Sequence, residues 1–228
     1  MDVFLDLGFT LVGGPELSPP KMVQQILGLP DESKGVLSDI TFCERHTTPQ
    51  SFIRSLSDAF EILLTPHQEQ EIQNYWKRQY SDLFKLDGAS NLVFFLRNSG
   101  LKVHIVSNLW YPFYQSCQAL LPELFDFVAT QTLSYGEGVR KPSDEFYRRA
   151  IARSGAIVAD SMVIGDSITK DILPFVQYRS KGIWFKSRPL DMQSINQKRK
   201  VLSKYKNIFE ASSLYEVQSI VEGIISNG

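Results

Sequence analysis

Residues 1–11, MDVFLDLGFTL, open the chain with a short apolar run that ends in a carboxylate. The apolar run Val3-Phe4-Leu5 is typical of a buried strand. Asp6 follows it directly, and Thr10 comes four residues later. A carboxylate that is buried beside such a strand needs a partner, a metal ion or a proton. The stretch therefore predicts a buried strand whose carboxyl end carries a functional group.

Short apolar runs recur along the chain and alternate with segments of helical periodicity. Each run is rich in β-branched or aromatic residues and ends in turn residues, so each is predicted as a strand. After Val3-Phe4-Leu5, the predicted strands cover residues 103–106, 125–129, 162–164 and 182–185. Apolar residues with helical spacing lie at 92–96, 146–151, 172–176 and 214–221. This alternation favours an α/β protein built from parallel βαβ units.

The stretch from about 15 to 84 breaks the alternation with consecutive helical patterns. We therefore predict a helical domain over residues 15–84, inserted after the first strand of a core formed by residues 1–14 and 85–228. Hinges are expected at residues 13–15 and 85–88, and helix connections at residues 46–49 and at Thr65-Pro66. Two apolar faces are predicted in the insertion, one formed by Phe52, Leu56, Phe60, Leu63 and Leu64 and one by Ile72, Tyr75, Trp76 and Leu83.

Composition excludes several classes of protein. The 228 residues are 43% hydrophobic and 21% charged, which is ordinary globular usage and rules out a disordered chain. A net charge of -1 predicts neither a nucleic-acid partner nor an anionic membrane surface, and no apolar run has the length of a membrane span. Two cysteines, Cys43 and Cys117, are too few for a disulfide framework, and the acidic start at Asp2 is unlike a signal peptide. We expect a cytoplasmic protein.

Polar and charged residues follow several of the predicted strands. Ser107-Asn108 come after residues 103–106, and Gly165-Asp166 come after residues 162–164, with Asp171 shortly beyond. Lys141-Pro142 are expected to open a helix. Parallel strands gather their carboxyl ends at one edge of the sheet, where ligands bind. Carboxylates suit a hard cation such as Mg²⁺, and a lysine suits an anion, so this edge is predicted to bind a divalent cation and a phosphate.

The order and spacing of these motifs resemble the haloacid dehalogenase-like hydrolase superfamily. The residues that carry the resemblance are Asp6-xxx-Thr10-Leu11, Ser107-Asn108, Lys141-Pro142 and Gly165-Asp166-xxxx-Asp171. The resemblance covers the whole chain, and it also includes Lys85-Leu86-Asp87-Gly88 and Asp171-Ile172-Leu173-Pro174. It implies a Rossmann-like parallel sheet with a helical type-one cap inserted after the first strand. It also implies that the strands bearing Asp6 and Asp166 are neighbours.

The resemblance further implies a Mg²⁺-dependent phosphatase that acts on a small phosphorylated metabolite. Asp6 resembles the nucleophile that accepts the phosphoryl group. Ser107, Asn108 and Lys141 would bind that group, and Lys141 would neutralise its charge against Asp6. The implied catalytic set is Asp6, Thr10, Ser107, Asn108 and Lys141, and the implied metal ligands are Asp6, the backbone of Gly8, Asp166 and Asp171.

Gly8 departs from the family pattern. Phosphatases of the superfamily usually have a second aspartate at this position, followed by a glycine where this chain has Phe9. That aspartate protonates the leaving alcohol and then activates water. Such general acid–base catalysis typically raises the rate by about 10²–10⁴-fold. The backbone carbonyl of that aspartate also binds the metal, and Gly8 keeps that carbonyl. The candidates to replace the missing side chain are Glu16, His46 and His67.

Three interpretations follow from Gly8. The first is a phosphatase whose substrate has a good leaving group, or whose acid comes from the cap. The second is a dehalogenase-like enzyme, since halide needs no proton to leave, with Arg45 or Arg54 holding a carboxylate. The third is a non-catalytic member that binds a phosphorylated ligand or a protein. The retained Asp6, Ser107, Lys141 and Asp166 favour an active enzyme.

Overall fold

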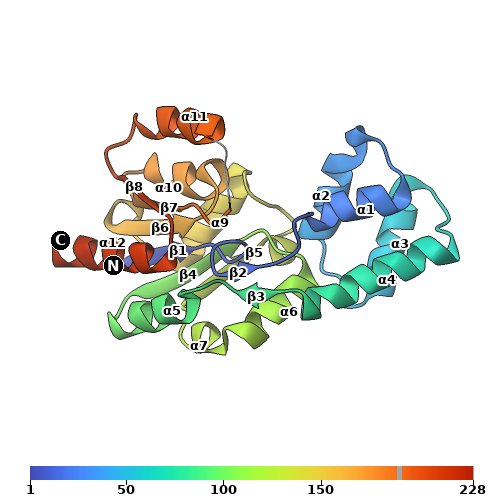
Figure 1. Ribbon diagram of the computed structural model, residues 1–228, viewed down its shortest axis with the longest axis horizontal. Coiled ribbons are helices and arrows are strands. Elements are labelled where there is room, and N and C mark those ends of the chain that lie inside the picture. Colours follow the sequence, from blue (N-terminus) through green and yellow to red (C-terminus); the bar gives the residue numbers. More distant parts are fainter. Residues whose placement is uncertain (189–191, 228) are drawn as a thin grey trace.

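A computed structural model describes residues 1–188 and 192–227, and these residues form a parallel sheet of six strands (Figure 1). The strand order is β5-β4-β1-β6-β7-β8. The strands are β1 (Asp2–Leu5), β4 (Lys102–Ser107), β5 (Thr130–Leu133), β6 (Ser161–Gly165), β7 (Lys181–Phe185) and β8 (Ile208–Ala211). Every pair in this sheet is parallel, and β1 lies between β4 and β6. The α/β prediction is confirmed, as is the expected pairing of the strands that lead to Asp6 and Asp166.

Helices cover both faces of the sheet, which explains why its inner strands are buried along almost their whole length. Val3 and Leu5 of β1 belong to one apolar core, and Phe4 belongs to the other. The first face packs against α5 (Ala89–Asn98), α6 (Tyr111–Leu120), α7 (Pro122–Phe125) and α12 (Leu214–Ser226). The second face packs against α9 (Asp144–Ser154), α10 (Leu173–Val176) and α11 (Met192–Leu202), with η2 (Val158–Asp160), η3 (Ile168–Ile172) and α8 (Ser134–Glu137) in the connections.

Residues 15–84 hold four α-helices that extend to one side of the sheet (Figure 1). These are α1 (Pro19–Leu27), α2 (Lys34–Cys43), α3 (Pro49–Phe60) and α4 (Pro66–Ser81), with η1 (Asp31–Ser33) before α2. We call this segment the helical insertion. The chain leaves and returns through a two-stranded antiparallel ribbon, β2 (Val12–Gly13) with β3 (Phe84–Lys85). Both ends of the insertion are therefore fixed side by side, and the first of them lies a few residues after Asp6 in the chain.

Local capping explains where two helices of the insertion begin. Pro49 and Pro66 each occupy the first helical position, where a missing N–H costs nothing. The Thr48 hydroxyl accepts from the Ser51 amide, and Thr65 and Gln68 form a capping box. The predicted connections at 46–49 and Thr65-Pro66 are confirmed.

Three sequence predictions are wrong. Lys141-Pro142 do not open a helix, because they lie in a turn and α9 begins at Asp144 after its N-cap Ser143. Residues 125–129 are not a strand, because Pro122 starts a short helix that buries Leu124, and the strand β5 follows at Thr130–Leu133. Leu63 does not join the Phe52 face, because α3 ends at Phe60 and Leu63 is 96% exposed. The short strands β2 and β3 and the edge strand β8 were not predicted.

In the described ranges 1–188 and 192–227, no helix has both the length and the apolar run that crossing a membrane requires.

Candidate active site

The carboxyl ends of β1, β4 and β6 meet and bring the predicted site residues together. Asp6 follows β1, and its amide donates to the Ile164 carbonyl at 3.0 Å, which extends the ladder with β6. Ser107 ends β4, Asp166 follows β6, and Asp171 lies on η3. Glycine is required at position 165, because an added Cβ there would lie 2.4 Å from Cβ of Asp171. The close approach of η3 to the strand end places Asp171 in the site.

Lys141 lies at the centre of this cluster and is 3% exposed. Its ammonium donates to Oδ1 of Asp6 at 2.8 Å, to Oδ1 of Asp171 at 2.5 Å and to the Val106 carbonyl at 3.0 Å. All three ammonium hydrogens therefore have acceptors. Burial by itself would lower the pKa of Lys141, but the Asp171 and Asp6 carboxylates outweigh it and raise that pKa. The lysine is a fixed positive charge shared by two buried carboxylates.

The Asp6 carboxylate is held at both oxygens. Oδ1 accepts from Ser107 Oγ at 2.8 Å in addition to Lys141, and Oδ2 accepts from Thr10 Oγ1 at 3.0 Å. Thr10 and Ser107 are themselves buried. These hydrogen bonds fix the side chain in one orientation at the end of β1, with Asp6 itself lining a cavity.

Asn108 holds the backbone of Lys141. Its Nδ2 donates to the Lys141 carbonyl at 3.0 Å, and its Oδ1 accepts from the Lys141 amide at 2.8 Å. Both ends of the Asn108 amide are thus engaged in positioning Lys141, although the residue also lines the cavity.

Three carboxylates stand close enough together to bind one cation. Asp6, Asp166 and Asp171 each offer an oxygen, and these atoms lie within 4.8 Å of one another. Burial raises the pKa of Asp171 to about 7, and the neighbouring Asp6 and Asp166 add to the rise. Burial and the Asp6 charge also raise the pKa of Asp166. Oxygen donors with this excess of negative charge fit a hard divalent cation such as Mg²⁺, which would relieve the repulsion.

Arg188 and Phe9 belong to the same site, although neither residue was predicted to lie there. Arg188 Nη2 donates to Oδ2 of Asp166 at 2.8 Å, and its guanidinium lies 4.1 Å from the centre of the Phe9 ring. Phe9 has a φ of 58°, an unusual value for a bulky residue, in a turn closed by its amide and the Val12 carbonyl. Arg188 lies just past β7, so the rule that ligands bind at strand ends could have identified it.

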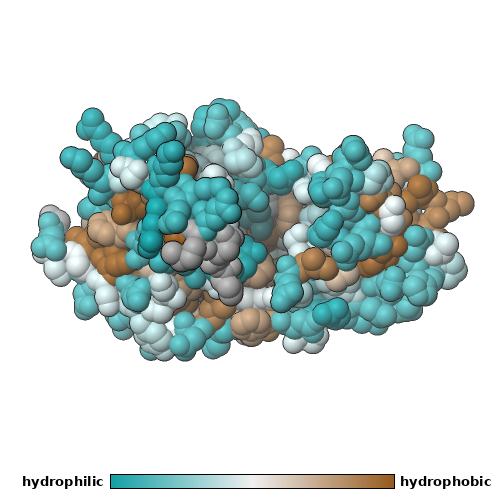
Figure 2. Space-filling model, turned by 45° about the horizontal axis from the view of Figure 1, so that its top comes forward, coloured by the Kyte–Doolittle hydropathy of each residue, from teal (hydrophilic) through white to brown (hydrophobic). Residues whose placement is uncertain are grey.

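A cavity of about 590 Å³ lies between the sheet edge and the helical insertion. Figure 2 shows the surface hollowed between these two parts of the molecule. One wall of the cavity is formed at the sheet edge and includes Asp6, Lys141, Asp166 and Asp171. The opposite wall comes from the insertion and includes Leu17, Lys21, Lys34, Phe42, Tyr75 and Gln79. This volume is in the range of about 300–1,000 Å³ that is usual for small-molecule sites.

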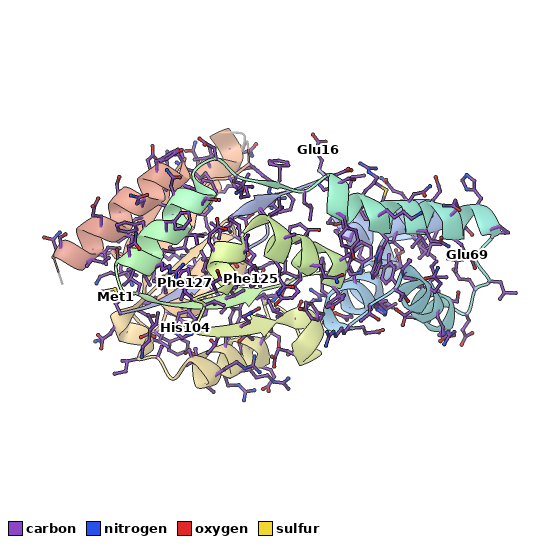
Figure 3. All side chains as sticks on the ribbon, turned by 90° about the horizontal axis from the view of Figure 1, so that it is seen from below. Met1, Glu16, Glu69, His104, Phe125 and Phe127 are labelled. Carbon is purple, nitrogen blue, oxygen red and sulfur yellow. The ribbon has the colours of Figure 1, made fainter. Side chains whose placement is uncertain are left out.

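None of the residues considered as substitutes for the missing acid lines this cavity. Glu16 is exposed and projects outward from its loop (Figure 3). His46 is buried with Nε2 3.1 Å from the Ile40 carbonyl, and the 81% exposed His67 side chain pairs with Glu71. Arg45 and Arg54 do not line it either, and Arg45 stacks on the Tyr111 ring instead.

The chain matches one protein-family model, and it is similar to known proteins and solved structures. The family model for haloacid dehalogenase-like hydrolases matches residues 32–177, a region that begins after Asp6, Gly8 and Thr10. The chain is 26% identical over 112 residues to glyceraldehyde 3-phosphate phosphatase of Pyrococcus abyssi. That match covers 49% of this chain and 47% of the relative, so the chain spans about half the length of the curated relatives it matches.

Two solved structures share the fold. A phosphatase of this family from Thermococcus onnurineus superposes with a TM-score of 0.56 at 19% identity, covering 96% of this chain and 97% of that one. An enzyme of the family from Bacteroides thetaiotaomicron, in complex with magnesium and inorganic phosphate, gives a TM-score of 0.59 at 17% identity. Here the coverage is 85% of this chain and 98% of the other.

Proposed function

Because the chain belongs to the haloacid dehalogenase-like hydrolases, we propose that it is a Mg²⁺-dependent phosphatase of small phosphorylated metabolites that works through phospho-Asp6. The observation that carries the proposal is the Asp6 carboxylate, fixed by Ser107, Thr10 and Lys141 beside two further carboxylates. The phosphatases named among its relatives support the same reaction class. Residues 15–84 would form the cap over a core of residues 1–14 and 85–228. The free thiols of Cys43 and Cys117 support a cytoplasmic location.

The proposed reaction has two displacements at phosphorus. In the first, a carboxylate oxygen of Asp6 forms a bond to phosphorus, and the bond from phosphorus to the substrate oxygen breaks with its electron pair leaving on that oxygen. In the second, water attacks the phosphorus of phospho-Asp6 and releases inorganic phosphate and the free carboxylate. Dividing one difficult step into two easier ones is the gain of covalent catalysis.

The side chains around Asp6 would stabilise the charge that develops. Ser107 would donate to a phosphoryl oxygen, and the fixed ammonium of Lys141 would reduce repulsion between Asp6 and the incoming anion. Asp6, Asp166, Asp171 and the Gly8 carbonyl would hold Mg²⁺, which when bound neutralises the phosphoryl oxygens. Asn108 would keep Lys141 in place through its backbone.

Phosphate release from aryl, acyl and sugar phosphates, measured with and without Mg²⁺, tests this function. We expect Mg²⁺-dependent release, fastest from aryl and acyl phosphates, because no cavity-lining carboxyl beyond the three clustered ones is available in the described residues to protonate a poor leaving group. A folded protein that binds phosphate with Mg²⁺ yet releases none from any substrate would favour the non-catalytic interpretation. A non-catalytic protein that binds a phosphorylated ligand is therefore the second candidate function. It would use the same site residues, and the missing acid at Gly8 favours it.

Gly8→Asp should raise the turnover of a simple alkyl phosphate by about 100-fold, the lower part of the usual range for a general acid–base. Position 8 has room for a side chain, because the atoms nearest to an added Cβ lie 3.8 Å away on Leu109 and Phe113. Initial rates are measured on ethyl phosphate and on 4-nitrophenyl phosphate, whose leaving group needs little protonation. A gain on ethyl phosphate alone would show that the new carboxyl acts as the general acid. A variant that folds, binds Mg²⁺ and gains nothing on ethyl phosphate would contradict this account of Gly8.

Arg188→Gln should tighten Mg²⁺ binding about twofold to fivefold. The guanidinium and the cation would compete for Asp166, and an ion pair with one well-exposed partner is worth up to about 1 kcal/mol. Calorimetric titration of the protein with Mg²⁺ measures the change directly. Arg97→Gln, an exposed arginine on α5 away from the cavity, is the matched control. An unchanged or weaker Kd in Arg188→Gln would mean that Arg188 does not oppose the metal.

A further inference from the structure

The cavity is larger than the phosphoryl group that its sheet wall would bind. The residues that handle this group in the proposed function all lie at the ends of β1, β4 and β6 or beside them. The rest of the roughly 590 Å³ faces the helical insertion. The chemistry of the insertion wall therefore bears on the part of the substrate beyond its phosphate.

In the part of the chain that the structure describes, the charged side chains that the insertion contributes to this cavity are both lysines. Lys21 lies in the first turn of α1, and Lys34 is the first residue of α2. Among the described residues, the carboxylates that line the cavity are Asp6, Asp166 and Asp171, all on the sheet side. The remainder of the insertion wall is apolar or uncharged, with Leu17, Phe42 and Tyr75 among its members.

The two lysines share one counterion that does not line the cavity. Lys34 Nζ lies 2.9 Å from Oδ1 of Asp31, and Lys21 Nζ donates to Oε1 of Gln24 at 3.1 Å. Gln24 in turn donates to Oδ1 of Asp31 at 3.0 Å. The Asp31 side chain is 72% exposed and points its charge toward solvent as well as toward the lysines. One positive charge on this wall is left without a carboxylate.

A count of charges over the whole cavity gives the same surplus of one positive charge. Its described lining has six cations, Lys21, Lys34, Arg140, Lys141, Lys170 and Arg188, against three carboxylates. Asp31 and Asp39 pair with Lys34 and Arg140 from outside the lining, which reduces the excess from three charges to one. Mg²⁺ and a phosphate dianion cancel each other, so their binding leaves this excess in place. A second negative group on the substrate would balance it.

We propose that Lys21 and Lys34 bind a second acidic group of the substrate, so that the preferred substrate is a phosphate ester that also carries a carboxylate or a second phosphate. This inference rests on the proposed function for the phosphate end of the molecule. The apolar side chains between the two ends would contact the carbon skeleton that joins the two acidic groups.

Matched pairs of probes test the second anionic site without requiring the probes to turn over. The probes are ω-carboxyalkyl phosphates with two to five carbons and the corresponding carboxamides, which have the same shape without the charge. A parallel series with a terminal phosphonate distinguishes a carboxylate site from one for a second phosphate. Each compound is measured as an inhibitor of 4-nitrophenyl phosphate hydrolysis and, independently, by calorimetric binding in the presence of Mg²⁺.

We expect the best carboxylate or phosphonate probe to bind about tenfold more tightly than its carboxamide, and the ratio to fall as ionic strength rises. In the double variant Lys21→Gln/Lys34→Gln the ratio should approach one, and each single variant should give an intermediate value. Lys77→Gln, an exposed lysine on α4 outside the cavity, should keep the ratio of the original protein.

The outcomes separate the two proposals. Loss of discrimination in the double variant, but not in Lys77→Gln, supports the second anionic site. Equal binding of charged and uncharged probes, in a protein that hydrolyses 4-nitrophenyl phosphate, overturns the second anionic site and leaves the phosphatase proposal standing. No Mg²⁺-dependent binding of any probe or of inorganic phosphate overturns the phosphatase proposal and the site that rests on it. Calorimetry gives this answer even if hydrolysis is absent.

Discussion

Asp6→Asn is expected to reduce Mg²⁺-dependent phosphate release by about 10⁴-fold or more, since loss of a covalent nucleophile typically has effects of this size or larger. An amide nitrogen and a neutral amide oxygen cannot take over the attack on phosphorus. The substitution also removes one of the three carboxylates that would bind Mg²⁺. The loss should therefore appear in kcat on every substrate, whatever the quality of the leaving group.

The measurement is single-turnover and steady-state phosphate release from 4-nitrophenyl phosphate, with phospho-protein trapped by acid quench. Asp160→Asn, an exposed aspartate next to β6 and outside the cavity, is the matched control and should keep the original rate. The shape of the asparagine side chain allows Ser107 and Lys141 to donate to its oxygen, so the variant should still fold. Activity within tenfold of the original protein would overturn Asp6 as the nucleophile.

The sequence could predict that the site residues come together, because parallel strands gather their carboxyl ends at one edge of a sheet. Apolar runs located β1, β4, β6 and β7, and the polar residues directly after three of them had to meet at one edge. The prediction failed at residues 125–129, where an apolar composition favoured a strand. There Pro122 and the burial of Leu124 made a helical turn instead, and the more polar Thr130–Leu133 paired with β4. Tertiary pairing outweighed local propensity.

The insertion wall of the cavity could not be predicted for a different reason. Lys21 and Lys34 have the sequence pattern of ordinary surface lysines, and no local spacing distinguishes them. Their position depends on how α1 and α2 pack over the sheet edge, where the contacts are long-range and include the Arg140–Asp39 ion pair at 2.8 Å. The contact of Arg188 with Phe9 likewise joins residues that lie far apart in the sequence.

Lys141→Met is expected to destabilise the protein by about 3–5 kcal/mol, the usual cost of removing one partner from a buried ion pair. Methionine fills much of the space but donates no hydrogen bond. Asp6 and Asp171 would lose the ammonium that lies 2.8 Å and 2.5 Å from their oxygens, and the Val106 carbonyl would lose its donor. Two buried carboxylates would then repel each other without compensation. In a chain of this length the Tm should fall by about 6–20 °C.

Thermal unfolding in metal-free buffer measures this loss, and two comparisons identify its cause. The double variant Lys141→Met/Asp171→Asn should be more stable than Lys141→Met alone, because it removes one of the two uncompensated charges. Mg²⁺ should raise the Tm of Lys141→Met by more than that of the original protein, since a cation would replace the missing positive charge among the same oxygens. If Lys141→Met melted within 2 °C of the original protein, Lys141 would be a peripheral group and the charge balance argued for this site would be wrong.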